Sequence, residues 1–586
     1  MEIRRTFDIL YSTAHKYPDS VALSSKKRGV WKSYTYKEYQ QITDKITLGL
    51  ISLGVEKNDT IASITNNRPE WNFIDMAIAQ AGAIHVPLYP NYNLNDFKFI
   101  LNNAEVKYIF TGTKLLWDIL SKIRSDLPLV KEIFCFDEQT DIPGLNTIIE
   151  KGADISDQNV LNVRKSMIQE DDLVSLYYTS GTTGYPKGAM VSHKNIVSVV
   201  NTMFKIYCLR KCQKVLSYLP LSHSFESAHN YLYQYSASSV YYAESTATVL
   251  ENMKEVQPIM FLTVPLLLEK IVGAITDKGR FSVGPQKKLF DWAYTLAMKY
   301  DIDHPLSLKY RIELHLARLF VFRKWKRMMG GKVKIISAGG ASQPEHFLKL
   351  FTAMGINVLE VYGLTETYGI AGNSIQKGIK FGTVGVPWTN VQVKIDNDGE
   401  ILCKSPYIIK GYYKQPELTS RIIDEEGWFH TGDLGEFIDN KFLKIIGRKG
   451  VTFKTSSGNF FSPENVERKL KQNPFFKHVI IFGKDKNYLS ALIVPNFEHI
   501  AKWSNIEGIN DTEPEKLIQN QKIINEFQKE IDDYNKSSWE TEMIREIKLL
   551  NDDWSVTSGE LTPLMKVKRN FIEQKYKIVI DGFYKE

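Results

Sequence analysis

The chain has 586 residues, of which 43% are hydrophobic and 24% are charged; these values are typical of globular proteins and exclude a fibrous or disordered chain. Its net charge of +7, from 74 Lys and Arg against 67 Asp and Glu, is small for this length. Such a balance suits an anionic small ligand or an anionic membrane surface and requires no nucleic-acid partner.

Cysteine usage and the absence of long apolar runs predict a cytoplasmic protein. Four cysteines are too few for a disulfide framework, and Cys208 and Cys212 lack a second Cys or His pair that would complete a zinc site. The apolar positions of the first 20 residues are interrupted by Asp8, Ser12 and His15, as a signal peptide would not allow. No apolar run reaches the roughly 20 residues of a membrane span.

Short β-rich runs alternate with helical patterns through the first three quarters of the chain. This alternation is typical of parallel sheets covered by helices, so we expect an α/β fold whose large N-terminal lobe holds two such sheets. The runs are TIASIT (60–65), AIHVPLY (83–89), VKYIFTG (106–112), LVSLYYT (173–179), KVLSYLP (214–220), IMFLTVP (259–265), VKIISAGG (333–340) and INVLEVYG (356–363).

One basic segment between these runs has two interpretations. Residues 289–329 are basic and amphipathic, with Phe320, Phe322 and Trp325 among five Lys and Arg between 318 and 327. Such a helix either lies on anionic lipid or is a surface helix whose aromatic rings pack on the protein's own sheet. The second interpretation is favoured.

From Val391 the pattern changes to strands joined by polar turns, which indicates a small antiparallel β subdomain. Ile445–Gly450 is a basic junction flanked by glycines. Beyond it, runs at 478–483 and 490–495 predict a strand pair, and a polar helical stretch extends from about Pro514 to Trp539. We expect residues 1–447 to form the large lobe and 448–586 a smaller, mobile α+β domain.

The stretch from Tyr177 to Met190, YYTSGTTGYPKGAM, combines hydroxyl side chains, glycines and one lysine. Because small residues let the backbone approach an anion, the composition predicts a phosphate-binding loop that follows a strand. The spacing differs from the Walker motif, which requires Ser or Thr directly after the lysine.

In its exact order, TSGTTGYPKG resembles the phosphate loop of the adenylate-forming family, which includes acyl-CoA synthetases, adenylation domains and luciferases. Five further segments follow in the family's order: SAGGAS (337–342), VYGLTETYG (361–369), GWFHTGDLG (427–435), GRKGVTFKT (447–455) and LTPLMKVKR (561–569). The resemblance therefore spans nearly the whole chain.

The resemblance implies a complete ATP site. Residues 179–184 and Lys187 would hold the β- and γ-phosphates, residues 339–341 and Tyr362 would hold adenine, and Asp433 with Arg448 would bind the ribose. Glu366 would bind Mg²⁺ and Thr365 would contact the α-phosphate. The implied ATP-binding residues are Thr179, Ser180, Gly181, Thr182, Thr183, Gly184, Lys187, Gly339, Gly340, Ala341, Tyr362, Gly363, Thr365, Asp433 and Arg448.

The first step that the resemblance implies is attack of a carboxylate on the α-phosphate of ATP. Two anions meet in this step, so a positive charge is needed at the reacting centre. By the register of the motif that charge is Lys566, although LMKVKR departs from the commoner SGK of the family and leaves Lys568 as an alternative.

The second step would transfer the acyl group to a thiol after rotation of the C-terminal domain. That rotation would turn the surface of the C-terminal domain that carries Lys566 away from the site and bring the surface near Lys454 to it. The usual charged hinge residue is absent, and Gly450 and Val451 stand at the expected position. We expect rotation here without assigning it to one of the two residues.

Several segments resemble long-chain fatty acyl-CoA synthetases rather than acetyl or aryl relatives. They are NRPEW (67–71), YLPLSHSFE (218–226), the basic insertion before residue 330, and ALIVPNFE (491–498). His223 would lie near the acyl-adenylate, whereas an isolated histidine is more often structural. VPLLLE (264–269) lacks the Arg of the commoner VPRVWE, which leaves an entrance charge there in doubt.

The sequence thus predicts an ATP-dependent long-chain fatty acid:CoA ligase that uses Mg²⁺, ATP and CoA, with peripheral contact to the inner face of a membrane. Two alternatives stay open: a ligase that loads the acyl group onto a carrier protein, and a catalytically silent acyl- or nucleotide-binding relative. Lys566, Glu366 and Asp433 together argue against a silent protein.

Overall fold

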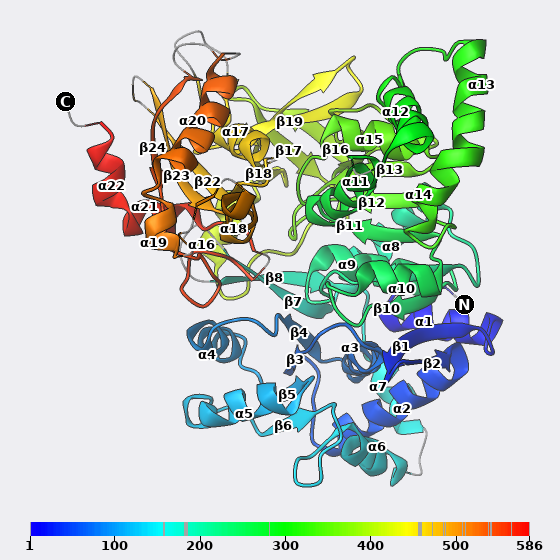
Figure 1. The fold of residues 1–586 in the computed structure, drawn as a ribbon. Coiled ribbons are helices and arrows are strands. Elements are labelled where there is room, and N and C mark those ends of the chain that lie inside the picture. The colour runs from blue at the N-terminus through cyan, green and yellow to red at the C-terminus, as the bar shows by residue number, and fades with distance from the viewer. Residues whose placement is uncertain are drawn as a thin grey trace.

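The computed structural model describes residues 2–584 except 156–158, 181–185, 281, 455–459, 472, 485, 487, 507, 510, 512, 537, 539–541 and 564. The chain forms a large N-terminal lobe, blue to yellow in Figure 1, and a smaller C-terminal lobe in orange and red that we call the lid. This arrangement confirms the expected α/β fold with a smaller C-terminal domain.

The first large sheet has six strands in the order β6-β5-β3-β4-β7-β8 and is parallel except for the last pair. Its central strand is buried along its whole length, as both faces are covered by helices. The strands are β3 (Thr60–Ile64), β4 (Ile84–Leu88), β5 (Tyr108–Thr111), β6 (Glu132–Cys135), β7 (Leu173–Ser180) and β8 (Pro186–Ser192).

The second large sheet has nine strands in the order β15-β14-β13-β12-β11-β9-β10-β1-β2. It is parallel from β13 to β1 and antiparallel at both edges. The strands are β1 (Val21–Lys27), β2 (Val30–Thr35), β9 (Lys214–Ser217), β10 (Ser239–Tyr242), β11 (Met260–Thr263), β12 (Ile335–Ala338), β13 (Asn357–Tyr362), β14 (Ala371–Gly372) and β15 (Val386–Pro387).

Helices α1, α3, α8 and α9 lie between the two sheets (Figure 1), and one hydrophobic cluster joins Ile61 of the six-stranded sheet to Val215 of the nine-stranded sheet. Trp71 and Tyr231 fill that cluster. The N-lobe helices are α1 (Thr6–Lys16), α2 (Tyr36–Ser52), α3 (Pro69–Ala81), α4 (Leu94–Asn103), α5 (Lys114–Lys122), α6 (Leu145–Ala153), α7 (Asn159–Ser166), α8 (His193–Tyr207), α9 (Ser224–Tyr235), α10 (Val249–Val256), α11 (Pro265–Arg280), α12 (Gly284–Met298), α13 (Leu308–Ala317), α14 (Arg323–Arg327), α15 (Glu345–Ala353) and α16 (Pro416–Ile422), with a 3₁₀ turn η1 (Arg124–Asp126) and a π-helical turn η2 (Arg318–Phe322).

The expected antiparallel subdomain is present as a four-stranded sheet in the order β16-β17-β18-β19. Polar turns such as Asp439–Asn440, where both residues have positive φ, connect its strands. The strands are β16 (Gln392–Ile395), β17 (Glu400–Lys404), β18 (Phe429–Ile438) and β19 (Phe442–Arg448).

The lid has a three-stranded sheet with a separate hydrophobic cluster on each face. Its β22–β23 pair confirms the predicted strand pair, and the predicted helical stretch contains α19 and α20, separated where Asn520 caps α20. The lid elements are β20 (Phe453–Lys454), β21 (Phe460–Phe461), α17 (Pro463–Leu470), β22 (Phe476–Phe482), β23 (Leu489–Pro495), α18 (Phe497–Ile506), α19 (Pro514–Leu517), α20 (Gln521–Asn535), β24 (Ile544–Leu549), α21 (Arg569–Lys575) and α22 (Lys577–Gly582).

The predicted strand before the loop is β7, but the prediction of a loop was wrong for residues 186–190, which belong to β8 and pair with β7. The amide of Met190 donates to Gly411 O at 2.9 Å and the amide of Tyr413 donates to Gly188 O at 2.8 Å. Residues of β8 thus pair on both sides, with β7 and with 411–413, and these backbone bonds outweigh the loop tendency of small residues.

The aromatic residues of the basic segment divide between the two interpretations. Phe322 and Trp325 are buried, and the Trp325 ring lies 5.3 Å from that of Phe290 on α12. Phe320 is exposed. Within the described part of the chain, no helix is both long enough and apolar enough to cross a bilayer.

Candidate active site

Lys187 and Glu366 are brought together by Tyr412, a residue that the sequence did not single out. The Tyr412 hydroxyl donates to Glu366 Oε1 at 2.6 Å, and Lys187 Nζ lies 5.5 Å from the centre of the Tyr412 ring. Burial lowers the pKa of Lys187, while the Glu366 carboxylate opposes this effect. A buried cation on the hairpin and a carboxylate therefore share one tyrosine neighbour.

Of the remaining phosphate-loop residues, the structure describes Thr179 and Ser180. Thr179 and Ser180 end β7, where Thr179 pairs with Lys187 of β8. The predicted residues Gly181, Thr182, Thr183 and Gly184 lie outside the described residues.

Asp433, Tyr362 and Arg448 form a second polar group at the edge of the antiparallel subdomain. Asp433 of β18 pairs in register with Arg448 of β19, so their side chains meet: Arg448 Nε lies 2.9 Å from Asp433 Oδ1. The Tyr362 hydroxyl donates to Asp433 Oδ2 at 2.7 Å. Burial raises the pKa of Asp433, and the Arg448 guanidinium opposes that rise.

Three glycines near these groups stand where a side chain would be crowded or strained. Directly after β12, a Cβ on Gly339 would lie 3.0 Å from the Phe225 ring, and Gly340 has φ of +80°. A Cβ on Gly363 would lie 2.2 Å from Tyr368 O. Gly340 and Ala341 are exposed, so this segment offers an accessible surface without bulk.

His223 is the N-cap residue of α9, and its Nδ1 accepts a hydrogen bond from the Phe225 amide at 3.1 Å. Burial, and then the positive charge of Lys566, lowers the pKa of His223 to about 4. The imidazole is therefore neutral at pH 7, with Nδ1 acting as the acceptor.

Lys566 is held in a tight turn of the lid. Thr562 amide donates to Lys566 O at 2.8 Å, the Lys566 amide donates to Thr562 Oγ1 at 3.1 Å, and Leu561 bridges Val567 in antiparallel register. Met565 takes a positive φ of 61° to close the turn.

The charge of the Lys566 side chain acts on N-lobe groups described above. The side chain is accessible to solvent, yet the surrounding protein lowers its pKa. The Arg448 guanidinium lowers the pKa further, whereas the carboxylates of Glu464 and Asp433 oppose the shift. Lys566 thus lies in the electrostatic range of Asp433, Arg448 and His223.

Lys568, the alternative to Lys566, faces another part of the N-lobe. Burial raises the pKa of Asp96 near the start of α4, and the charge of Lys568 opposes that rise. The two lysines therefore have different neighbours, and of the two it is Lys566 that lies near Asp433.

Helix α17 of the lid adds contacts that sequence reasoning missed. Arg468 donates to Ser342 Oγ, which follows Ala341, and the Glu360 carboxylate opposes the lowering of the Arg468 pKa by burial. On the other side of the lid, Asn91 Nδ2 donates to Pro563 O at 3.1 Å. No motif marked Arg468, since its partners are more than 100 residues away.

The junction between the lobes is a tight turn. The amides of Val451 and Thr452 both donate to Arg448 O, and Gly450 has φ of +89° with no atom within 4 Å of a Cβ placed on it. Lys449 binds Asp398 and Glu400 of the subdomain at 2.6 and 2.7 Å. Lys454 ends β20, and its side chain is not among those described.

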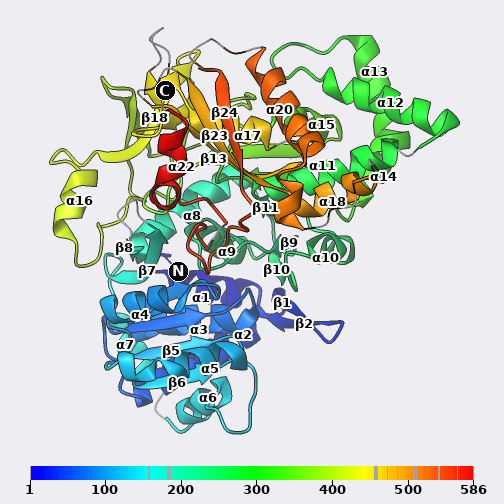
Figure 2. The same cartoon turned by 60° about the vertical axis from the view of Figure 1, so that its left-hand side comes forward.

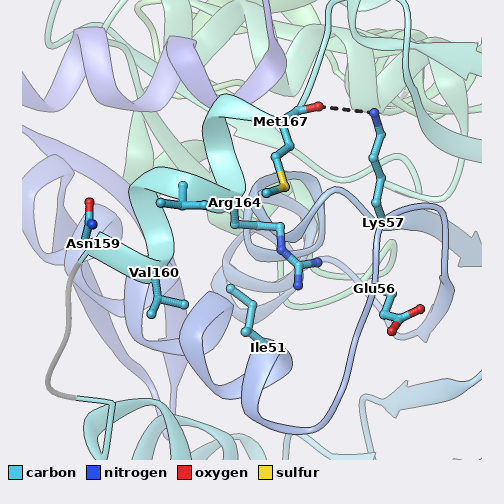
Figure 3. A pocket seen from close by; sticks show the side chains of 8 residues that line it. Ile51, Glu56, Lys57, Asn159, Val160, Arg164 and Met167 are labelled. Carbon is cyan, nitrogen blue, oxygen red and sulfur yellow. Dashed lines mark hydrogen bonds between the residues drawn. The ribbon is translucent and has the colours of Figure 1, made fainter.

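A separate surface pocket lies away from this site, between α2 and the end of α7 (Figure 3). Lys57 Nζ donates to Met167 O at 3.2 Å across it. None of the predicted site residues lines the pocket, whose walls are Ile51, Glu56, Lys57, Asn159, Val160, Val163, Arg164 and Met167.

Comparison with protein families gives two matches that together cover most of the chain. The model of the AMP-binding enzyme family matches residues 10–413, and that of the AMP-binding enzyme C-terminal domain matches residues 452–586.

Named relatives match over nearly the full length. Long-chain-fatty-acid–CoA ligase FadD15 of Mycobacterium bovis is 28% identical over 97% of this chain and 95% of its own. The peroxisomal long chain acyl-CoA synthetase 6 of Arabidopsis thaliana is 28% identical over 100% of this chain and 87% of its own.

Solved structures share the fold at low identity. The anthranilate CoA ligase AuaEII in complex with anthranoyl-AMP superposes with a TM-score of 0.71 at 17% identity, over 98% of both chains. The adenylation domain of a carboxylate reductase from Mycobacterium chelonae gives a TM-score of 0.73 at 19% identity, over 99% of this chain and 91% of its own.

Proposed function

The chain belongs to the AMP-binding enzyme family, and from this premise we propose that it is an ATP-dependent long-chain fatty acid:CoA ligase that forms an acyl-adenylate and releases AMP and pyrophosphate. Two relatives with that activity in their names match nearly the whole chain. The observation that carries the proposal is the contact of the lid with the N-lobe beside the polar groups of the candidate site: Arg468 donates to Ser342 Oγ next to the 339–341 segment, and the charge of Lys566 acts on His223.

ATP would lie between the hairpin, the 339–341 segment and the antiparallel subdomain. Lys187 and residues 179–184 would bind the β- and γ-phosphates, and Thr365 the α-phosphate. The exposed glycine segment and Tyr362 would hold adenine. Asp433, fixed by Arg448 and the Tyr362 hydroxyl, would accept hydrogen bonds from the ribose.

The residues present fit a magnesium ion bound mainly through phosphate. Glu366 is half-buried, and one of its oxygens is held by Tyr412. Among the described residues, no group of three or more His, Cys, Asp or Glu could hold a metal without help. A hard cation that takes its remaining ligands from phosphate oxygens suits one carboxylate, and it would neutralise phosphate charge.

In the first step, an oxygen of the fatty carboxylate attacks the α-phosphorus. The new oxygen–phosphorus bond forms while the bond to the pyrophosphate oxygen breaks. Lys566 would stabilise the charge that develops between the two anions, and the neutral His223 would lie beside the acyl carbonyl without adding another charge.

In the second step, the CoA thiolate attacks the acyl carbonyl, and the carbon–oxygen bond to AMP breaks. This step would follow a rotation of the lid at Gly450 and Val451 that brings Lys454 to the site. Because Lys449 is bound to Asp398 and Glu400 on the N-lobe side, the pivot would begin after it, close to the proposed boundary between 447 and 448.

We also propose that the enzyme works in the cytoplasm at the periphery of a membrane, where long-chain acids partition. Each CH₂ transferred from water to an apolar environment gains about 0.8 kcal/mol, so free long-chain acid in water is scarce. Exposed apolar residues on α13 support contact with such a surface.

The test is product formation from carboxylic acids of graded length with ATP, Mg²⁺ and CoA. Pyrophosphate release that requires a long-chain acid, with AMP and acyl-CoA as products, is expected. Adenylate formed without transfer to CoA, but transferred to a carrier protein, would favour the carrier-loading alternative. No pyrophosphate with any acid would leave only the silent relative.

A further inference from the structure

Helix α13 and the turn η2 carry a line of large apolar side chains that face solvent. Their spacing of four, four and three residues from Leu308 onward places them on one face of the helix. We call them the α13 stripe: Leu308, Ile312, Leu316, Leu319 and Phe320, exposed by 72%, 54%, 42%, 50% and 60%.

The opposite face of the same helix is well anchored, so the stripe is not a frayed end. Leu314 and Ala317 are buried, and the Tyr310 hydroxyl donates to Leu296 O of α12 at 2.8 Å. Arg318 Nε donates to Ala353 O of α15 at 2.8 Å. In Figure 1, α13 stands at the outer edge of the molecule, and Figure 2 shows it again at the periphery, next to α12.

The charge around the stripe selects the kind of partner. Residues 308–327 contain seven Lys and Arg and a single acidic residue, Glu313. Lys309, Arg311, Arg323 and Lys324 are exposed beside the stripe. An apolar line flanked by basic groups matches the boundary between anionic headgroups and acyl chains, where apolar side chains insert and cations bind phosphate.

We propose that the α13 stripe docks the protein onto an anionic lipid surface. The proposal rests on the proposed function for its purpose, the supply of long-chain acid. Helix α13 packs on α12, which packs on α11. Helix α11 begins at Pro265, directly after Val264. The Cγ1 atom of Val264 would lie 3.7 Å from a Cβ placed on Gly340. The α13 stripe is thus connected to the 339–341 segment, the proposed adenine site, through helices that pack directly on one another.

The experiment measures co-sedimentation of the full chain with vesicles of phosphatidylcholine alone and with added phosphatidylglycerol. The wild-type protein is expected to bind the anionic vesicles. The double variant Ile312→Glu with Leu316→Glu should bind them at least about 10-fold more weakly, because it inserts two charges into the apolar line. The variant Lys309→Gln with Lys324→Gln should lose much of the preference for anionic vesicles.

The matched control is Leu115→Glu, which alters an exposed leucine on α5 of the other large sheet. Binding like that of the wild type supports the proposal, and an equal loss in the control overturns it. A different result would overturn the proposal: the wild-type protein does not bind vesicles, and sedimentation velocity shows a wild-type dimer that the Ile312→Glu/Leu316→Glu variant does not form. The stripe would then be assigned to contact with a second copy of the chain. Vesicle binding requires no turnover, so this result is independent of the pyrophosphate assay.

Discussion

Lys566 and Lys568 stand two residues apart but have different neighbours. Lys566 lies near Asp433 and His223, whereas Lys568 lies near Asp96. The turn closed by Met565 sets this difference, since it fixes the direction in which Lys566 leaves the backbone. The register of one short turn thus separates a candidate catalytic residue from a lysine whose charge acts on Asp96 of the N-lobe.

We predict that Lys566→Ala lowers the rate of acyl-adenylate formation by at least about 100-fold, because it removes a charge that stabilises the transition state. Thioester formation from supplied acyl-AMP should be largely retained. Pyrophosphate exchange and single-turnover transfer to CoA measure the two steps. Lys568→Ala is the matched control and should keep adenylation near the wild-type rate; equal loss in both steps for Lys566→Ala contradicts the assignment.

At the scale of elements, His193 connects α8 to α1. The Thr6 amide at the start of α1 donates to His193 Nδ1 at 3.2 Å, and burial lowers the pKa of His193 to about 3. Between this value and the usual pKa of about 6.5, the unfolded chain binds more protons than the folded one. This group therefore destabilises the fold as the pH falls from 6.5.

We predict that the free energy of unfolding drops on acidification from about pH 6.5 to 4, by up to about 1.4 kcal/mol per pH unit for this histidine. His193→Asn should flatten that part of the profile, as an amide does not titrate. Urea denaturation across the pH range is the measurement. An unaltered slope in His193→Asn would refute the prediction.

The sequence predicted the positions of strands and helices better than it predicted which of them are in contact. The spacing of apolar residues and the β-branched residues located the buried strands β3, β4, β5 and β7 of one sheet and β9, β11, β12 and β13 of the other, because burial on two faces leaves a clear apolar run. Strand order could not be predicted: β1, near the N-terminus, pairs with β10 more than 200 residues later. Strand β8 (186–192) was missed for the same reason, since its second partner, 411–413, is remote in sequence.

The candidate site shows the same division between local and remote information. Motif order led to Lys187, Glu366, Asp433 and Lys566, and the fold brings each of them to one of two neighbouring polar groups. Tyr412 and Arg468 act on these groups from other segments and carry no local signal. Their roles depend on tertiary contacts alone.

At the scale of the whole molecule, the junction between the lobes depends on one left-handed residue. Gly450 has φ of +89°, and the space around it is open, so the constraint comes from conformation and not from packing. Proline, restricted to φ near −65°, cannot adopt the observed geometry.

We predict that Gly450→Pro disfavours the lid position that presents Lys566, so pyrophosphate exchange falls at least about 10-fold. Thioester formation from supplied acyl-AMP should fall less. Gly29→Pro, at a turn of similar φ (+81°) between β1 and β2, controls for strain as such and should leave the ratio of the two rates unchanged. A parallel loss of both rates in Gly450→Pro would place the pivot elsewhere.

The hydrophobic clusters of the lid and of the N-lobe share no described residue. Described contacts between the lobes, such as Arg468 to Ser342 and Asn91 to Pro563, are hydrogen bonds between partly solvent-exposed groups. Separating such groups exchanges protein partners for water at little net change in free energy. The lid therefore contacts the N-lobe through weak interactions, and we expect that a bound ligand with a modest preference for one orientation of the lid would shift it to that orientation.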